Sequence, residues 1–393
     1  MSAEVDVAVV GAGIHGTGIA QAAAAAGHSV LLLEQTAVAH GSSSRSSKLI
    51  HGGLRYLESG QFGLVRESLR ERALMLKLAP ELVQVQRFYI PVYRHTRRRP
   101  WQLRLGLALY AALAGFTPEA RFGTLPRPEW DRLDGLDTRE LQAVFWYQDG
   151  QTDDRALTRA VLRSAESLGA RLVCPAEFQS ARLVEDGVEL QFSAHHGLEP
   201  CRARVLINAA GPWAEAVARR VTPAIEIPRL ECVQGAHLIL EGTLERGVYY
   251  LESPRDGRAV FVIPYQGRIM VGTTETPHQG DPSQVAPTEA EVQYLLGVLK
   301  HYFPRWRTVS ERDLIARFAG LRVLPAGGDR AFHRSRETQL VTDRRRRPRL
   351  LSVYGGKLTT WRAVSQRAFA LIAPSLPQRR AIARTDRLPL TSP

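Results

Sequence analysis

Cysteine is scarce in this chain of 393 residues, which has only Cys174, Cys201 and Cys232. The three are odd in number, lie far apart and form neither a CxxC pair nor a zinc-type spacing, which argues against a disulfide-stabilised scaffold and a structural zinc site. Two histidines beside Gly197 lie near Cys201, but a hairpin turn at the glycine accounts for them. We therefore predict no metal site.

The sequence also shows no signal-peptide pattern and no apolar run long enough to cross a membrane. It passes from Met1 into an apolar strand pattern with no charged leader or cleavage site, so we expect a cytoplasmic protein. Residues 105–113 are apolar but too short to span about 30 Å of hydrocarbon. Because arginines and Trp101 precede them, residues 94–116 are predicted either to lie on an anionic surface at the inner face of the cell membrane or to form a helix buried in a second domain.

Lysine is almost absent, with four residues among the 52 lysines and arginines, so arginine carries the formal net charge of +13. A preference for arginine codons explains this excess as well as an anionic partner does. No zinc-finger, RNP or KH signature accompanies the charge, so no nucleic-acid partner is expected. The hydrophobic share of 44% and the charged share of 23% exclude a wholly disordered or fibrous chain.

A strand, a glycine-rich turn, a helix and a second strand are predicted within residues 6–34. Gly11, Gly13 and Gly16 match the GxGxxG pattern, in which glycines permit a tight turn, close approach of the backbone to a pyrophosphate and close packing of helix on strand. Glu34 ends the second strand, where its carboxylate would accept hydrogen bonds from both ribose hydroxyls. The pattern predicts a site for an ADP moiety and leaves NAD and FAD open.

Four further motifs follow in order along the chain. They are SSSRSSKLIHGGLRYLE at residues 42–58, NAAGPW at 208–213, GLR at 320–322 and GGKLTT at 355–360. Together they resemble the signatures of FAD-dependent glycerol-3-phosphate dehydrogenases, within the D-amino-acid-oxidase-like flavoprotein superfamily, over residues 4–370. Longer members carry a C-terminal helical domain after the last motif, and this chain is expected to be a short form without it.

The resemblance implies an α/β fold in which a Rossmann-type FAD-binding domain is interleaved with a substrate domain of the α+β type, built on a mainly antiparallel sheet. Two compositional styles alternate along the sequence, which also favours discontinuous domains. We expect the FAD-binding domain at residues 1–86, 148–225 and 341–393, and the substrate domain at residues 87–147 and 226–340.

The resemblance also implies a reaction, the oxidation of sn-glycerol 3-phosphate to dihydroxyacetone phosphate by hydride transfer to flavin N5. Electrons would pass on to quinone, or to oxygen as in the oxidases of the family. Two alternatives stay open, namely oxidation of another small amine or 2-hydroxy acid and a non-catalytic flavin-binding scaffold. A homodimer and a covalent bond to FAD are likewise left open.

Cationic side chains within these motifs are candidates for holding a phosphate, because arginine forks and a lysine ammonium match its oxygens. The predicted substrate-binding residues are Arg55, Tyr56, His237, Arg322 and Lys357. The predicted catalytic residues are His51, His237 and Arg322. Either histidine would suit proton removal near neutral pH, and a role for His51 in hydrogen bonding to the flavin alone stays open.

The remaining candidates are predicted to contact FAD. They come from the glycine-rich turn, the end of the second strand at Glu34, and three of the four motifs. They are Gly11, Gly13, Ile14, His15, Gly16, Glu34, Ser42, Ser43, Ser47, Lys48, Leu49, Ala210, Gly211, Trp213, Gly356, Lys357, Leu358, Thr359 and Thr360.

Overall fold

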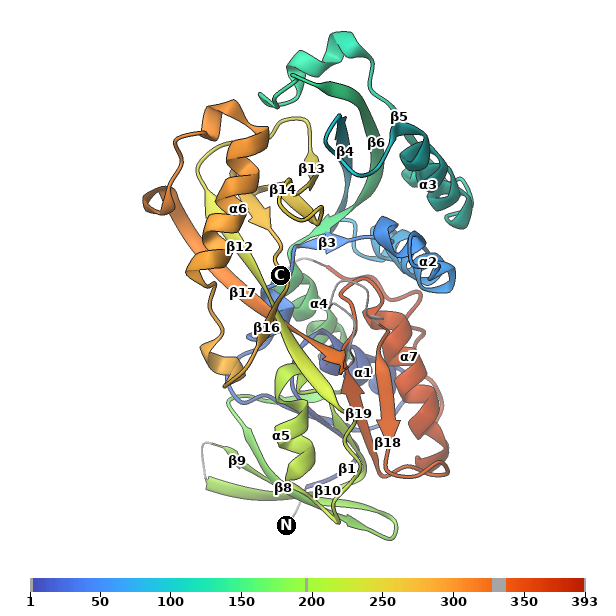
Figure 1. Ribbon diagram of the computed structural model, residues 1–393. Helices are drawn as coiled ribbons and strands as arrows, with labels where there is room; N and C mark the ends of the chain where they lie inside the picture. Colours follow the sequence, from blue (N-terminus) through green and yellow to red (C-terminus); the bar gives the residue numbers. More distant parts are fainter. Residues whose placement is uncertain (1–2, 195–196, 327–336, 392–393) are drawn as a thin grey trace.

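The computed structural model describes residues 3–194, 197–326 and 337–391, and its two large sheets occupy the lower and upper halves of Figure 1. The first sheet has nine described strands, in the order β11-β8-β9-β10-β1-β2-β7 with β19 beside β10 and β18 beside β19. The neighbours β10, β1, β2 and β7 run parallel, as in a dinucleotide-binding unit. The strands are β1 (Ala3–Val10), β2 (Val30–Leu33), β7 (Arg171–Val173), β8 (Glu177–Val184), β9 (Gly187–Ala194), β10 (Gly197–Asn208), β11 (Val221–Thr222), β18 (Gln339–Thr342) and β19 (Leu350–Tyr354).

Helices cover the first sheet where its central strands β1 and β2 are apolar on both faces. Helix α1 (Ile14–Ala25) packs against α4 (Asp154–Ser167) and α7 (Trp361–Ile372), and its alanines let these helices approach closely. The short α5 (Ala214–Arg219) follows β10. Strand β2 is buried over its whole length, as expected for a parallel strand covered on both sides.

The second sheet has ten described strands, in the order β16-β12-β15-β14-β13-β4-β6-β3 with β17 beside β12 and β5 beside β6. All its pairs are antiparallel except β13 with β4. The strands are β3 (Leu49–Ile50), β4 (Val83–Tyr93), β5 (Phe122–Thr124), β6 (Leu141–Thr152), β12 (Leu230–Leu240), β13 (Val248–Glu252), β14 (Ala259–Tyr265), β15 (Arg268–Gly272), β16 (Thr276–His278) and β17 (Leu314–Pro325).

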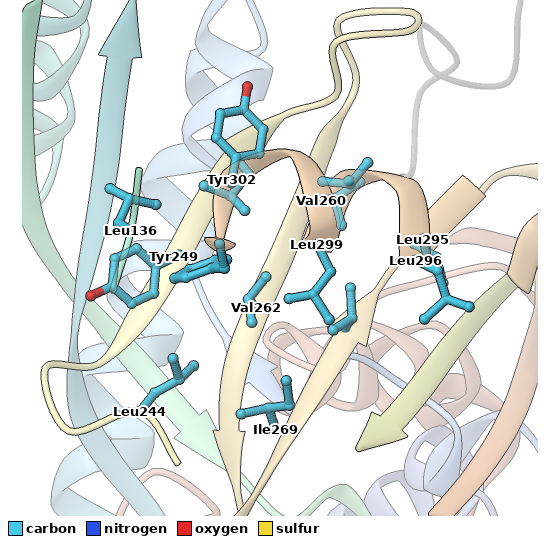
Figure 2. Packing of buried hydrophobic residues seen from close by; sticks show 14 of the residues in the cluster. Leu136, Leu244, Tyr249, Val260, Val262, Ile269, Leu295, Leu296, Leu299 and Tyr302 are labelled. Carbon is cyan, nitrogen blue, oxygen red and sulfur yellow. The ribbon is translucent and has the colours of Figure 1, made fainter. Parts of the chain in front are cut away.

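Three helices accompany this sheet: α2 (Phe62–Leu78), α3 (Pro100–Leu113) and α6 (Glu289–Tyr302). Helix α6 begins with a capping box between Thr288 and Glu291, which satisfies amides at its first turn. It packs against β12, β14 and β15, and Figure 2 shows its leucines beside Val262 and Ile269. Each buried leucine contributes about 1.5–3 kcal/mol. The contacting side chains include Tyr249, Val260, Val262, Ile269, Leu295, Leu296, Leu299 and Tyr302.

The mixed α/β architecture with a mainly antiparallel second sheet confirms the predicted fold class. Each sheet takes its strands from several separate stretches of the sequence. Strand β3 lies in the first stretch expected for FAD binding, residues 1–86, but it pairs with β6 of the second sheet. The division into domains at the given residue limits stays a prediction. Among the described residues, no helix is long and apolar enough to cross a membrane.

Candidate functional site

A cavity of about 390 Å³ is lined by residues of both sheets. At one end lie the glycine-rich turn and Glu34, and at the other lie His51, Arg55, Arg322 and Lys357. The cavity therefore joins the predicted nucleotide site to the predicted substrate site.

Glu34 follows β2 and presents its carboxylate at the nucleotide end. Its Oε2 accepts a hydrogen bond from the amide of Ala12 at 2.8 Å, and its Oε1 accepts one from the amide of Thr36 at 3.0 Å. Each carboxylate oxygen has a second lone pair, so the group is held in place and can still accept from two ribose hydroxyls.

Glycines bring the backbone close to this end of the cavity. Gly11 has φ +100°, and a Cβ there would lie 2.7 Å from the carbonyl oxygen of Ala209. Gly16 lies beneath the turn rather than in the cavity wall, and a Cβ there would lie 1.8 Å from the oxygen of Gly11. The amide of Ile14, at the first turn of α1, donates to Ser43 Oγ at 2.9 Å. Gly11, Gly13 and Ile14 line the cavity, and a phosphate contact at this turn stays a prediction.

His15 contributes a neutral ring to the same region. Burial, with a smaller effect of Arg367, lowers the pKa of His15 from 6.5 to about 4. Among the described residues its buried Nδ1 has no hydrogen-bond partner, and Gly356 leaves room for its ring. A buried polar atom at a cavity wall calls for a polar ligand. The glycine turn, the Glu34 carboxylate and this ring together fit FAD.

The loop between β3 and the 3₁₀ helix η2 (Leu54–Leu57) carries His51 to the other end, and η2 itself carries Arg55. Thr359 Oγ1 accepts from the His51 amide at 3.0 Å and donates to the His51 carbonyl at 3.2 Å. Gly53 has φ +81°, which allows the chain to turn before η2. Two motifs about 300 residues apart in the sequence therefore meet at the cavity.

The two arginines face one carboxylate that the sequence analysis missed. Arg55 Nη2 and Arg322 Nη1 each lie 3.6 Å from Glu275 Oε1. Arg322 Nη2 also donates to Thr273 Oγ1 at 3.1 Å. The side chain of Glu275 is 6% exposed at the cavity wall. Nothing in its local sequence separates it from the other acidic residues, because only the fold of the sheet brings it to the arginines.

Tyr56 joins the third cation to this group. The ammonium of Lys357 lies 3.8 Å from the centroid of the Tyr56 ring, and the Arg55 guanidinium lies 5.2 Å from it. Both distances are within the range of cation–π attraction. The predicted substrate residues thus line one end of the cavity, with the three cations around Tyr56 and Glu275.

His237 lines the cavity but is a weak base. Its Nε2 lies 2.9 Å from Ser47 Oγ, and its ring stacks on Phe318 at 5.0 Å between centroids. Burial, with the nearby Arg322 and Lys48, lowers the pKa of His237 from 6.5 to about 3. A base with that pKa takes protons poorly at neutral pH, so His237 is the less suitable of the two histidines for proton removal.

The ammonium of Lys48 points into the protein interior, and a contact of this residue with FAD stays a prediction. Its buried ammonium donates to Asp154 Oδ1 at 2.5 Å and to the Ser44 carbonyl at 2.6 Å, and the residue does not line the cavity. An ammonium in the interior needs such a partner, so this lysine holds the segment against α4. Thr360 is also outside the cavity wall, at the start of α7.

The other residues predicted for FAD line the cavity. They are Gly11, Gly13, Ile14, His15, Glu34, Ser42, Ser43, Ser47, Leu49, Ala210, Gly211, Trp213, Gly356, Lys357, Leu358 and Thr359.

Comparisons with known proteins point to one family. A glycerol-3-phosphate dehydrogenase of Pseudomonas aeruginosa is 40% identical over 380 residues, covering 94% of this chain and 72% of that protein. A D-erythritol 1-phosphate dehydrogenase of Brucella abortus is 35% identical over 380 residues, covering 95% and 74%. The X-ray structure of the glycerol-3-phosphate dehydrogenase from Bacillus halodurans complexed with FAD has the same fold, with a TM-score of 0.74 at 24% identity over 98% of this chain and 68% of that chain. Residues 6–362 match the family described as FAD dependent oxidoreductase, and the protein belongs to that family.

Proposed function

We propose that this flavoprotein oxidises sn-glycerol 3-phosphate to dihydroxyacetone phosphate. The observation that carries the proposal is the grouping of Arg55, Arg322 and Lys357 in the cavity wall, where the two arginines share Glu275 and the ammonium of Lys357 lies beside Tyr56. Like charges gathered in a partly buried site repel and lose solvation, so their grouping favours an anionic ligand. Relatives named for glycerol 3-phosphate and for D-erythritol 1-phosphate support a phosphorylated polyol.

The cations suit a phosphate better than a carboxylate. With Glu275 counted against the three cations, the site carries two positive charges, which match a phosphate monoester dianion. The two guanidinium groups can each offer paired N–H donors, and Lys357 adds a point charge. A 2-hydroxy acid or an amino acid would balance this charge less completely.

The reaction removes a hydride and a proton from a secondary alcohol. When bound, FAD supplies the acceptor for the hydride of the carbinol carbon. We assign removal of the hydroxyl proton to the imidazole of His51. This residue lines the cavity, and its amide is hydrogen-bonded to Thr359. The phosphate held by Arg55 and Arg322 fixes the distance between the carbinol carbon and this imidazole.

We further propose quinone as the electron acceptor and an anionic membrane as the docking surface. Helix α3 supports this proposal because it has two different faces. Leu103, Leu107 and Tyr110 are buried against the protein, whereas Trp101 and Leu105 are 66% and 64% exposed. Exposed Leu109 and Phe116 continue the apolar face, and Arg97, Arg99 and Arg104 lie near it.

An apolar stripe beside arginines suits a helix lying in the interface of an anionic bilayer. Because one face of α3 is exposed, residues 94–116 are not wholly buried. Among the described residues, α3 is also not a helix that could cross a membrane. The protein would then reach a quinone from the inner face of the cell membrane while its active site stays in the cytoplasm. The oligomeric state stays a prediction.

The deciding experiment is an anaerobic absorbance titration of the purified holoenzyme. Glycerol 3-phosphate is expected to bleach the flavin band near-stoichiometrically, while glycerol at the same concentration bleaches it far more slowly. D-Erythritol 1-phosphate, glycine and lactate serve as comparison substrates. Bleaching by glycine or lactate alone would replace the phosphate assignment, and no bleaching by any of them would leave a flavin-binding scaffold.

A further inference from the structure

A buried polar cluster lies directly behind the active-site loop. It joins three elements, with Arg72 from α2, Asp149 from β6 and Tyr110 from α3. Arg72 Nη1 donates to Asp149 Oδ1 at 2.6 Å and to the Gln148 carbonyl at 2.8 Å. The Tyr110 hydroxyl donates to Asp149 Oδ2 at 2.6 Å. All three side chains are at most 2% exposed, so they form an interior network rather than a surface ion pair.

Tyr110 connects this network to the loop between β3 and η2. The amide of Gly52 donates to the Tyr110 hydroxyl oxygen at 2.8 Å. Gly52 stands between His51 and Gly53, and Thr359 Oγ1 holds the His51 backbone from the other side. A Cβ at Gly52 would lie 2.5 Å from the Tyr110 hydroxyl, so the glycine allows this close contact.

We propose that Tyr110, oriented by Asp149 and Arg72, is a positioning residue that holds the loop His51–Gly53 and thereby sets the place of His51 and Arg55 at the substrate. This inference rests on the proposed function for the role of those two residues, and it goes beyond that function in naming what holds them. The cluster has no contact with the cavity of its own, since none of its three members lines it.

The order of donors and acceptors explains why the cluster can do this. Burial, strengthened by the Asp149 carboxylate, raises the pKa of Tyr110 well above its ordinary value, so the phenol stays neutral and donates to that carboxylate. Burial also raises the pKa of Asp149, while the Arg72 guanidinium opposes this and favours the carboxylate. The hydrogen bond that the Tyr110 hydroxyl donates to Asp149 polarises the phenol. Its oxygen is therefore a stronger acceptor for the Gly52 amide.

The test compares Tyr110→Phe with a matched control, Tyr249→Phe. Tyr249 is also buried, and its hydroxyl donates to the Asp134 carboxylate at 2.8 Å, but it has no bond to the loop. In single-turnover reduction by glycerol 3-phosphate, Tyr110→Phe is expected to slow flavin bleaching roughly tenfold or more, since small misplacements of reacting groups are costly. The control is expected to stay within about twofold of the wild-type protein, with both variants retaining FAD.

Hydrogen exchange gives a second readout that does not depend on turnover. In the wild-type holoenzyme, the peptide covering residues 49–57 is expected to exchange slowly at Gly52, and Tyr110→Phe should speed this exchange at least tenfold while Tyr249→Phe leaves it unchanged. Fast exchange at Gly52 in the wild-type protein would overturn the proposal without any variant. Equal effects of the two variants on exchange and on bleaching would show a general loss of stability and would also overturn it.

The two proposals can fail separately. If glycerol 3-phosphate does not bleach the wild-type flavin, the proposed substrate is wrong, and the exchange comparison still decides whether Tyr110 holds the loop. If bleaching is normal in Tyr110→Phe and exchange at Gly52 is unchanged, the substrate assignment stands and the positioning role is wrong.

Discussion

The charge of the substrate end is decided by a few side chains, and Glu275 is the one that balances it. Its Oε1 lies 3.6 Å from both Arg55 and Arg322, distances at which charges attract without a direct hydrogen bond. A dianion arriving at the arginines would meet both their attraction and the repulsion of this carboxylate. Glu275 is therefore expected to limit how tightly phosphates bind.

Replacement of Glu275 with Gln removes that repulsion while keeping the shape of the side chain. Inorganic phosphate should then inhibit competitively at roughly tenfold lower concentration, because charges a few ångströms apart interact by more than about 1 kcal/mol at an effective dielectric constant of about 20. Inhibition constants at fixed ionic strength measure the change. Glu252→Gln is the control, since Glu252 is a buried carboxylate that pairs with Arg98 at 2.9 Å outside the cavity. Weaker phosphate binding in Glu275→Gln would mean that the carboxylate instead holds the arginines in place.

Arg322→Lys tests the phosphate clamp, because it keeps the charge and removes the planar fork. The value of kcat/KM for glycerol 3-phosphate should fall by a factor corresponding to about 2–5 kcal/mol, the range for loss of a buried charged hydrogen-bond pair. The loss with glycerol should be much smaller, since glycerol has no phosphate. If the two substrates lost activity equally in steady-state assays, the arginine would serve the flavin or the fold rather than the phosphate.

At the scale of elements, α3 performs two tasks with its two faces. The inner face packs against α2, β6 and η2 and carries Tyr110, while the outer face exposes Trp101 and Leu105. Helix α3 begins at Pro100, earlier than the apolar run at residues 105–113 indicates. Proline is favourable in the first turn of a helix, because the amide proton that it lacks would have no partner there.

Trp101→Ser with Leu105→Ser should weaken binding to anionic vesicles by roughly tenfold or more, since burying one large apolar side chain contributes about 1.5–3 kcal/mol. Cosedimentation with phosphatidylglycerol vesicles at low ionic strength measures the binding, and added salt should weaken it. The control pair is Leu198→Ser with Ile382→Ser, which removes two side chains that are 59% and 62% exposed elsewhere. If the wild-type protein fails to sediment with these vesicles, the docking proposal is wrong.

For the whole molecule, burial of neutral histidines links folding to pH. The pKa of His15 is lowered to about 4 and that of His237 to about 3, each from 6.5. Between these values and 6.5 the unfolded chain binds protons that the folded chain does not, so stability falls as the pH falls. Each histidine contributes a slope of up to about 1.4 kcal/mol per pH unit.

The thermal unfolding midpoint of the holoenzyme should therefore drop between pH 6.5 and pH 5, and the drop should be smaller in His237→Gln than in the wild-type protein. Differential scanning fluorimetry over this range measures the effect at constant ionic strength. A midpoint that is flat across this range would show that neither buried ring resists protonation.

The sequence alone was enough for the features whose parts are neighbours along the chain. The glycine turn and Glu34 form one short βαβ unit, and local strand and helix geometry fixes their spacing, so the nucleotide end could be predicted from residues 6–34. The motifs around Arg55, Arg322 and Lys357 also named the cations that line the other end.

Only the tertiary structure decided which distant groups meet. Lys48 pairs with Asp154, Glu275 faces Arg55 and Arg322, and Tyr110 reaches Gly52, each across more than forty residues. Such pairs depend on how two sheets and three helices pack, and buried polar groups then take whichever partners that packing supplies. A side chain in a cofactor motif can consequently serve the fold, as Lys48 does, while a residue without a motif, such as Glu275, lies in the site.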